Sequence, residues 1–271
     1  MPVSKLKNLA LLILLLANLL LLALLIPKKL EQHKQAEDLR VSLSQFCNKQ
    51  NVSLDPDIVP ETTPLYEMEL TGGTAGKQAA LQALLGEHTL SEDSSISASA
   101  LTGGRWKDGS IKLKLTGRDA ISDLERDGKK ILQTLQFPYS ELSAPHRHSP
   151  GVYSLHADQI VLGVPVFSDG LTLTYINSIL TEISGSYYTG TLTKTNETAC
   201  ISAADAVVSF LSCRVDLGWV GSSITAVKQG YLPTVASSTS VRLTPTWELT
   251  TDTGSFYVNG LTSEVIPVQN S

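Results

Sequence analysis

Three histidines and an aspartate form the one group of residues whose types resemble a metal site. His146 and His148 lie in the proline-flanked stretch PHRHSP, and His156 and Asp158 follow shortly after it. Imidazole nitrogens and carboxylate oxygens are ligands for zinc. However, the stretch has neither helical nor strand periodicity to fix these side chains, and no glutamate is present to act as a base. We therefore expect a solvated linker here, and we predict no metal and no cofactor.

The stretch GGTAGKQ at residues 72–78 resembles a phosphate-binding loop only in part. The phosphate-loop pattern requires a glycine at the position of Thr71 and a serine or threonine at the position of Gln78. Both requirements fail, so we expect a turn followed by the start of a helix.

Nucleophilic catalysis has no sequence support. The G-x-S-x-G elbow is absent, and the one S-x-x-K match, Ser4 to Lys7, precedes a long apolar run. The carboxylates are scattered and form no pair for acid–base chemistry. We predict that the protein is not an enzyme, and an envelope hydrolase is only a third hypothesis.

An apolar run at residues 6–26 predicts a membrane-spanning helix. At about 1.5 Å per residue, it is long enough to cross a hydrocarbon core of about 30 Å. No small-x-small cleavage site follows it, which favours a retained anchor over a cleaved signal. We expect a cytoplasmic N-terminus, with residues 28–271 outside the membrane. Asn18 is the only polar residue of the run, and it is either a tolerated amide or a hydrogen-bonding contact to a partner helix.

Charge and cysteine content restrict the function further. The chain has a formal charge of −5, and residues 30–271 are more acidic because four lysines lie before Leu30. A negative surface argues against nucleic-acid binding. Cys47, Cys200 and Cys213 are too few and too dispersed for a disulfide framework, so we expect small buried residues.

Hydrophobic periodicity predicts helices at 76–85, 119–136 and 202–212. It also predicts strands at 65–70, 152–156, 159–162, 165–167, 171–175, 178–184, 224–231, 241–250 and 255–259, and a hairpin over 94–116. Residues 138–150 contain three prolines and few apolar residues, which indicates a boundary between two halves.

The predicted fold class is α+β, with an N-terminal transmembrane helix followed by two halves that each pair helices with an antiparallel sheet. The predicted domains are an anchor at 1–27, a helical stalk and linker at 28–60, an N-terminal α+β domain at 61–145 and a β-rich C-terminal domain at 146–271. Sequence does not establish a duplication.

Aromatic residues gather in the C-terminal half. Tyr231, Trp247 and Tyr257 lie in predicted strands, so they either fill the sheet core or line a ligand groove. Together with Asn18, they are the candidate partner-binding residues.

The closing stretch LTPTWELTTDTGSFYVNGLTSEV resembles the end of the YycH/YycI family of membrane-anchored regulators from Gram-positive bacteria. The matching residues are Leu243, Pro245, Trp247, Thr251, Gly254, Tyr257, Val258, Asn259, Thr262, Glu264 and Val265. The upstream stretch GVPVFSDGLTLTYINSILTEISGSYY is similar to the strand region of that family, and a comparable pattern occurs in PepSY domains. Gly260 and Ser263 depart from the family pattern.

This resemblance implies a non-enzymatic, extracytoplasmic regulator of a sensor histidine kinase that controls cell-wall metabolism. The implied partners are that kinase and a sister regulator, contacted through the membrane helix and the outer domain. The alternative is an extracytoplasmic module that binds a cell-wall polymer, a peptide or a protease.

Overall fold

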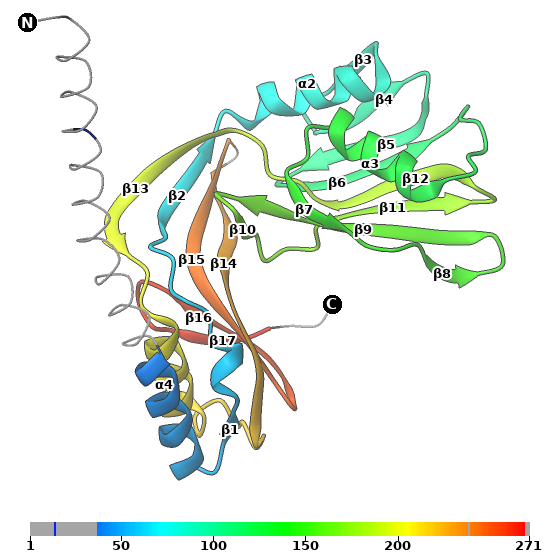
Figure 1. The fold of residues 1–271 in the computed structure, drawn as a ribbon. Coiled ribbons are helices and arrows are strands. Elements are labelled where there is room, and N and C mark those ends of the chain that lie inside the picture. The colour runs from blue at the N-terminus through cyan, green and yellow to red at the C-terminus, as the bar shows by residue number, and fades with distance from the viewer. Residues whose placement is uncertain (1–13, 15–36, 238, 269–271) are drawn as a thin grey trace, which may run out of the picture.

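The structure, a computed structural model, describes residue 14, residues 37–237 and residues 239–268. The chain forms two lobes, each built on one large sheet (Figure 1). We call residues 73–186 the inserted lobe, because the chain enters it from the other lobe and then returns. Residues 37–71 and 191–268 form the terminal lobe.

The terminal lobe combines strands from both ends of the described chain. Its elements are β1 (Ser53–Leu54), η1 (Pro56–Ile58), β2 (Tyr66–Thr71), β13 (Thr191–Ala199), α4 (Ala203–Cys213), β14 (Ser223–Ser237), β15 (Ser240–Thr251), β16 (Gly254–Asn259) and β17 (Val265–Pro267). The sheet has the order β1-β14-β15-β16-β17, and β2 pairs with both β15 and β13. The pairing of β1 with β14 is parallel, whereas the other pairings in this sheet are antiparallel.

The inserted lobe contains two helices, an eight-stranded sheet and a small hairpin. Its elements are α2 (Gly73–Leu85), β3 (His88–Leu90), β4 (Ile96–Ala98), β5 (Leu101–Lys107), β6 (Ser110–Leu115), α3 (Leu124–Thr134), β7 (Tyr139–Leu142), β8 (His146–Ser149), β9 (Val152–Val161), β10 (Val164–Pro165), β11 (Leu171–Ile176) and β12 (Ile179–Ser186). The main order is β10-β9-β11-β12-β6-β5, with β7 and β8 also paired to β9.

Local sequence explains several of these elements. In α4, Ser202 and Asp205 form a capping box in which each side chain accepts a hydrogen bond from the backbone of the other residue. Asp123 caps α3 by accepting a hydrogen bond from the Arg126 amide at 2.9 Å. In β6, exposed and buried residues alternate, as expected for a strand with one solvent-facing side.

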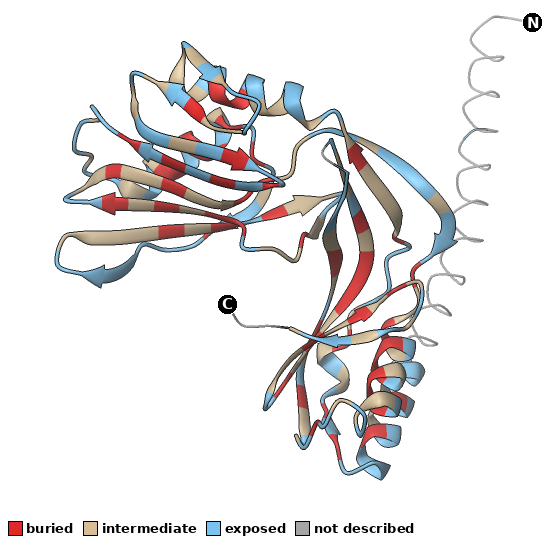
Figure 2. Ribbon diagram, turned by 180° about the vertical axis from the view of Figure 1, so that it is seen from behind, coloured by how far each residue is buried: buried red, intermediate tan, exposed pale blue. Residues whose placement is uncertain are grey.

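Each lobe has its own hydrophobic core. Figure 2 shows buried residues along both sheets and on the helices that cover them. Trp247, Tyr231 and Phe210 are fully buried in the terminal lobe, and Trp106 and Tyr175 are fully buried in the inserted lobe. Burial of such rings away from water is the main stabilising contribution that each core makes.

The predicted fold class is wrong. The described chain is a mixed α/β, β-rich fold with four α-helices, one of which spans residues 37–49. It does not fold as two successive halves, because β2 pairs with β13 and β15 across the whole length of the inserted lobe. Pairing between strands far apart in the sequence produces no local periodicity. The hydrophobic pattern of the sequence therefore did not predict that β2 pairs with β13 and β15.

The polar segment at 138–150 is not a solvated linker. It contains β7 and β8, both of which pair antiparallel with β9. All four residues of β8 are exposed. An edge strand of this kind is held by backbone hydrogen bonds, so it lacks the apolar residues on which the interpretation as a linker depended.

Most of the predicted anchor and the first part of the predicted stalk lie outside the described residues. In the described part of the chain, no helix is both long and apolar enough to span a membrane. The described part of the stalk, residues 37–49, is helical and packs onto the terminal lobe, where Leu43 and Cys47 are buried.

Candidate binding surface

The four candidate residues from the sequence do not come together. Asn18 lies outside the described residues. Tyr231 and Trp247 are fully buried, and Trp247 Nε1 donates a hydrogen bond to the Ile201 carbonyl at 3.0 Å. These two side chains therefore belong to the core. Of the three candidates that the structure describes, Tyr257 alone is partly exposed.

Tyr257 faces away from the helical side of the sheet. Phe256, its neighbour in β16, packs against Phe210 of α4 with ring centroids 4.8 Å apart. Successive side chains of a strand point to opposite faces, so Tyr257 lies on the other face. The helix α4 packs on the side of Phe256, opposite to Tyr257 (Figure 1).

The strand register arranges this face in rows. Lys228, Glu248, Tyr257 and Ile266 are successive cross-strand partners in β14, β15, β16 and β17. The next rows contain Gly230, Thr246 and Asn259, and then Leu232 and Thr244. Tyr257 and Ile266 are thus direct neighbours, and Ile266 is 42% exposed.

Phe167 attaches the inserted lobe to this face. Its ring stacks on Tyr257 at a centroid distance of 5.3 Å and an interplanar angle of 22°. The Phe167 amide also donates a hydrogen bond to the Tyr231 carbonyl at 2.8 Å. A side chain at Gly230 would place its Cβ 2.7 Å from the Phe167 ring, so glycine is required for this close approach.

Two adjoining hollows flank Tyr257, with volumes of about 610 and 130 Å³. Both are bordered by Leu232, Tyr257 and Ile266. The larger hollow extends toward the inserted lobe, and the smaller one extends over the threonines of β14 and β15. The remaining lining residues are Phe167, Ser168, Asp169, Pro267 and Val268 in the larger hollow and Thr234, Thr244, Thr246, Asn259 and Glu264 in the smaller one. We call these two hollows together the Tyr257 groove.

The electrostatics of the groove are mainly acidic. Burial is the main cause of a raised pKa at Tyr257, and the negative charges of Glu248 and Asp169 raise it further. The phenol therefore stays neutral and can donate a hydrogen bond. Glu264 borders the smaller hollow. This combination of an aromatic ring, an exposed isoleucine and acidic side chains suits a partner with apolar and basic groups.

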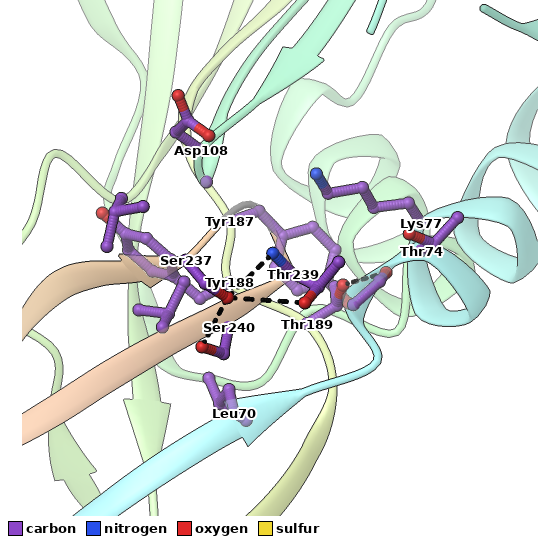
Figure 3. Close-up of a pocket in the computed structure, with 14 residues that line it drawn as sticks. Leu70, Thr74, Lys77, Asp108, Tyr187, Tyr188, Thr189, Ser237, Thr239 and Ser240 are labelled. Carbon is purple, nitrogen blue, oxygen red and sulfur yellow. Dashed lines mark hydrogen bonds between the residues drawn. The ribbon is translucent and has the colours of Figure 1, made fainter. Parts of the chain in front are cut away.

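A third hollow, of about 40 Å³, lies at the junction of the lobes (Figure 3). It lies between α2, the turn after β5, residues 187–189 and the β14–β15 hairpin. The Thr189 hydroxyl donates to the Gly73 carbonyl at 2.9 Å. The buried Gln159 side chain exchanges two hydrogen bonds, of 2.7 and 2.9 Å, with the Tyr188 backbone. This hollow has room for little more than a water molecule, so we interpret the junction as structural.

Lys77 in this junction does not form a phosphate site. Its Nζ donates to the Trp106 carbonyl at 3.4 Å and lies 5.7 Å from the centroid of the Trp106 ring. Burial lowers the pKa of Lys77, and the charge of Asp108 partly offsets this effect. As expected from the sequence, residues 72–78 form a turn and a helix start, with Gly72 in the left-handed conformation.

The described residues contain no larger cluster of potential metal ligands and no activated buried thiol. No group of three or more histidine, cysteine, aspartate or glutamate side chains there could hold a metal ion. Cys47, Cys200 and Cys213 are free thiols. Burial raises the pKa of Cys47 to about 11 and also raises that of Cys200, so neither thiol is activated as a nucleophile.

Sequence reasoning missed Phe167, Leu232 and Ile266 as groove residues. Ile266 lies in β17, a three-residue strand that periodicity cannot detect, and Phe167 comes from the other lobe. Leu232 could have been found from the sequence. The predicted strand ends at Tyr231, and one more residue of the same alternation places Leu232 on the face opposite to the core.

Comparison with known proteins finds similarity to solved structures at TM-scores below 0.5. No protein-family model matches the sequence, and no curated protein is significantly similar to it. Among solved structures, the chain is similar to an uncharacterised protein from Eubacterium rectale, at 8% identity and a TM-score of 0.49, covering 78% of this chain and 89% of that one. It is also similar to the C-terminal domain of Bacillus megaterium YpeB, at 12% identity and a TM-score of 0.34, covering 74% and 99%.

Neither likeness tests the resemblance to the YycH/YycI family, so that resemblance stays a prediction.

Proposed function

We propose that this protein is a non-enzymatic, membrane-anchored extracytoplasmic regulator that binds a sensor histidine kinase of a cell-wall-related two-component system. In this proposal, the outer domain contacts the kinase through the Tyr257 groove, and a sister regulator joins the complex. The apolar run at residues 6–26 and the resemblance of the C-terminal stretch support the membrane and kinase parts of the proposal.

The observation that carries the proposal is the composition of the Tyr257 groove. Its partly exposed aromatic and aliphatic side chains border the inserted lobe, where Phe167 stacks on Tyr257, and the buried Trp247 holds the sheet behind them. Anchors of this kind provide most of the binding energy in protein interfaces. A regulator bound in this way would shift the kinase only by the difference between its affinities for the two signalling states.

The test is affinity purification of the full-length protein in mild detergent from bacterial membranes, followed by mass spectrometry. A second sample carries an unrelated helix in place of residues 6–26. We expect a sensor kinase to be recovered with the native protein and lost or strongly reduced with the replacement. Absence of a kinase from both samples would contradict the proposal.

The groove is tested separately with Ile266→Asp. This change places a negative charge beside Tyr257 in an already acidic groove, so we expect at least a tenfold loss of recovered kinase. Val220→Asp is the matched control, because Val220 is 90% exposed and precedes β14, away from the groove. Equal recovery with both variants would exclude the groove as the contact surface.

The alternative function is an extracytoplasmic module for a cell-wall polymer, a peptide or a protease. The specific observation in its favour is that the smaller hollow combines the Tyr257 ring with the side chains of Asn259 and several threonines. Hydroxyl and amide groups beside an aromatic face can bind a polar polymer. Retention of the full-length protein on purified wall material, lost in Tyr257→Ala, would favour this alternative over kinase binding.

A further inference from the structure

The strand β8 gives His146 and His148 a fixed geometry that the sequence alone did not suggest. In the pairing with β9, His146 lies opposite Ser154 and Arg147 lies opposite Tyr153. The register of this pairing shifts between Arg147 and Ser149. The contact between the two rings and the hydrogen bond between His148 Nε2 and Ser154 Oγ therefore place both imidazoles on the face of Ser154. Arg147, the neighbour of His146 in the strand, projects from the other face. All of β8 is exposed, so a dissolved ion has direct access to both imidazoles.

The separation of the two rings matches that of a metal chelate. Their centroids are 4.8 Å apart. Two imidazoles bound to one metal through nitrogens at about 2.0–2.1 Å, at an angle of about 90–110°, would have centroids roughly 4.5–5.2 Å apart. The interplanar angle of 77° sets the two rings edge to face, so at least one of these exposed imidazoles must turn about its side-chain bonds for both nitrogens to face one ion.

Ser154 of β9 supplies a polar group beside the pair. His148 Nε2 and Ser154 Oγ share a hydrogen bond of 2.8 Å, so this nitrogen points toward the strand residue that faces His146. A metal ion bound to Nε2 would replace that hydrogen bond, and Ser154 Oγ could then accept a hydrogen bond from a metal-bound water.

We propose that His146 and His148 form a two-histidine chelate site for a late divalent transition-metal ion, with water completing the coordination. This inference is independent of the kinase proposal. Imidazole suits copper, nickel and zinc, whereas calcium and magnesium prefer oxygen ligands. With two neutral nitrogen ligands, the order of affinities follows the general series, in which copper binds more tightly than nickel or zinc.

The first measurement is calorimetric titration of the full-length protein with Cu²⁺, Ni²⁺ and Zn²⁺. The protein is prepared in mild detergent without a polyhistidine tag. We expect one site that prefers Cu²⁺, no binding of Mg²⁺, and at least a tenfold loss of affinity in either His146→Ala or His148→Ala. His88→Ala is the matched control, because it removes a histidine far along the chain from β8, and we expect it to leave the affinity unchanged.

A composition-preserving variant tests the geometry itself. Arg147→His combined with His148→Arg keeps both residue types but moves the second imidazole to the opposite face of the strand. We expect this double variant to lose affinity as strongly as His148→Ala. Electron paramagnetic resonance of bound Cu²⁺ should also show two coupled nitrogens in the native protein and one in each single variant.

Three outcomes would overturn the proposal. They are the absence of Cu²⁺ binding by the native protein, wild-type affinity in the exchanged variant, and an equal loss of affinity in His88→Ala. Binding spread over unrelated histidines would give the third result.

Discussion

The two lobes share one construction principle but present different faces to solvent. In both, α-helices pack on one side of a largely antiparallel sheet. We call the other side the open face, and in the terminal lobe Phe167 covers part of it. The open face of the inserted lobe carries charged and hydroxyl side chains, such as Lys112, Glu182 and Thr172. The open face of the terminal lobe carries Tyr257, Leu232 and Ile266.

This difference locates the candidate binding surface. A polar sheet face is stable in water without a partner, whereas an exposed aromatic and aliphatic patch is typical of an interaction site. The Tyr257 groove therefore arises from which residues occupy the alternate positions of β14, β16 and β17, and from the Phe167 loop that closes one end.

The largest expected effect is on the core of the terminal lobe. Trp247→Ala removes a fully buried ring and its hydrogen bond to the Ile201 carbonyl, which should cost about 3–5 kcal/mol of unfolding free energy. Hydrogen exchange should show lost protection in β14–β16. It should leave β5 and β6 protected, because the two cores are separate clusters.

Val220→Ala is the control for this change, since its side chain is almost fully exposed. If Trp247→Ala removes as much protection from β5 and β6 as from β14–β16, the two lobes unfold as one unit. That result would contradict the separation of the two cores.

An intermediate effect is expected where the lobes meet. Gly230→Ala would place a Cβ 2.5 Å from the Pro165 carbonyl oxygen and 2.7 Å from the Phe167 ring. The loop that carries Phe167 must move to remove this steric clash. We therefore expect Gly230→Ala to lower the unfolding free energy, measured by denaturant titration, by about 1–3 kcal/mol. Gly103→Ala is the matched control, because nothing lies within 4 Å of its added Cβ. Equal unfolding free energies of Gly230→Ala and Gly103→Ala would contradict the close contact between Gly230 and the Phe167 loop.

The smallest effect concerns the ion pair of His156 and Asp158, whose Nε2 and Oδ1 atoms are 3.0 Å apart. The hydrogen bond to Asp158 is the main cause of a raised pKa at His156. The same bond is the main cause of a lowered pKa at Asp158, to which Lys228 of the terminal lobe also contributes. Because both side chains are substantially exposed, the pair should contribute no more than about 1 kcal/mol.

The sign of the pH dependence follows from these two shifts. The raised pKa of His156 gives stability that is complete below about pH 6.5 and is lost as the pH rises through the raised value. The lowered pKa of Asp158 gives stability that is present above about pH 3.9 and is lost as the pH falls. The thermal midpoint of Asp158→Asn should therefore fall further below that of the native protein at pH 5.5 than at pH 8.5. An equal difference at both pH values would contradict this assignment.

Local sequence predicted several elements correctly. The helix predicted at 202–212 is α4, which begins with the Ser202–Asp205 capping box, and the hairpin predicted over 94–116 contains β5 and β6. The strands predicted at 241–250 and 255–259 are β15 and β16, which pair as a hairpin. Each of these signals involves residues within a few positions of one another, so it is present in the sequence itself.

The candidate sites depended on contacts that no local pattern contains. Tyr257 was identified as an aromatic candidate, but the sequence could not distinguish it from the buried Tyr231 and Trp247. That distinction requires knowing which face α4 covers. The two histidines of β8 were assigned to a linker, because the strand that fixes them is stabilised by its pairing with β9.

By itself, the sequence determined the helix caps, the alternation of individual strands, the acidic charge of the chain after its apolar start and the absence of recognisable catalytic motifs. Only the tertiary structure decided that β2 joins β13 and β15 around an inserted lobe, that Phe167 packs over Gly230, and that Ile266 lies beside Tyr257. The physical reason is that caps and periodicity act over a few residues. Strand pairing and ring packing instead depend on which distant segments bury one another's surface.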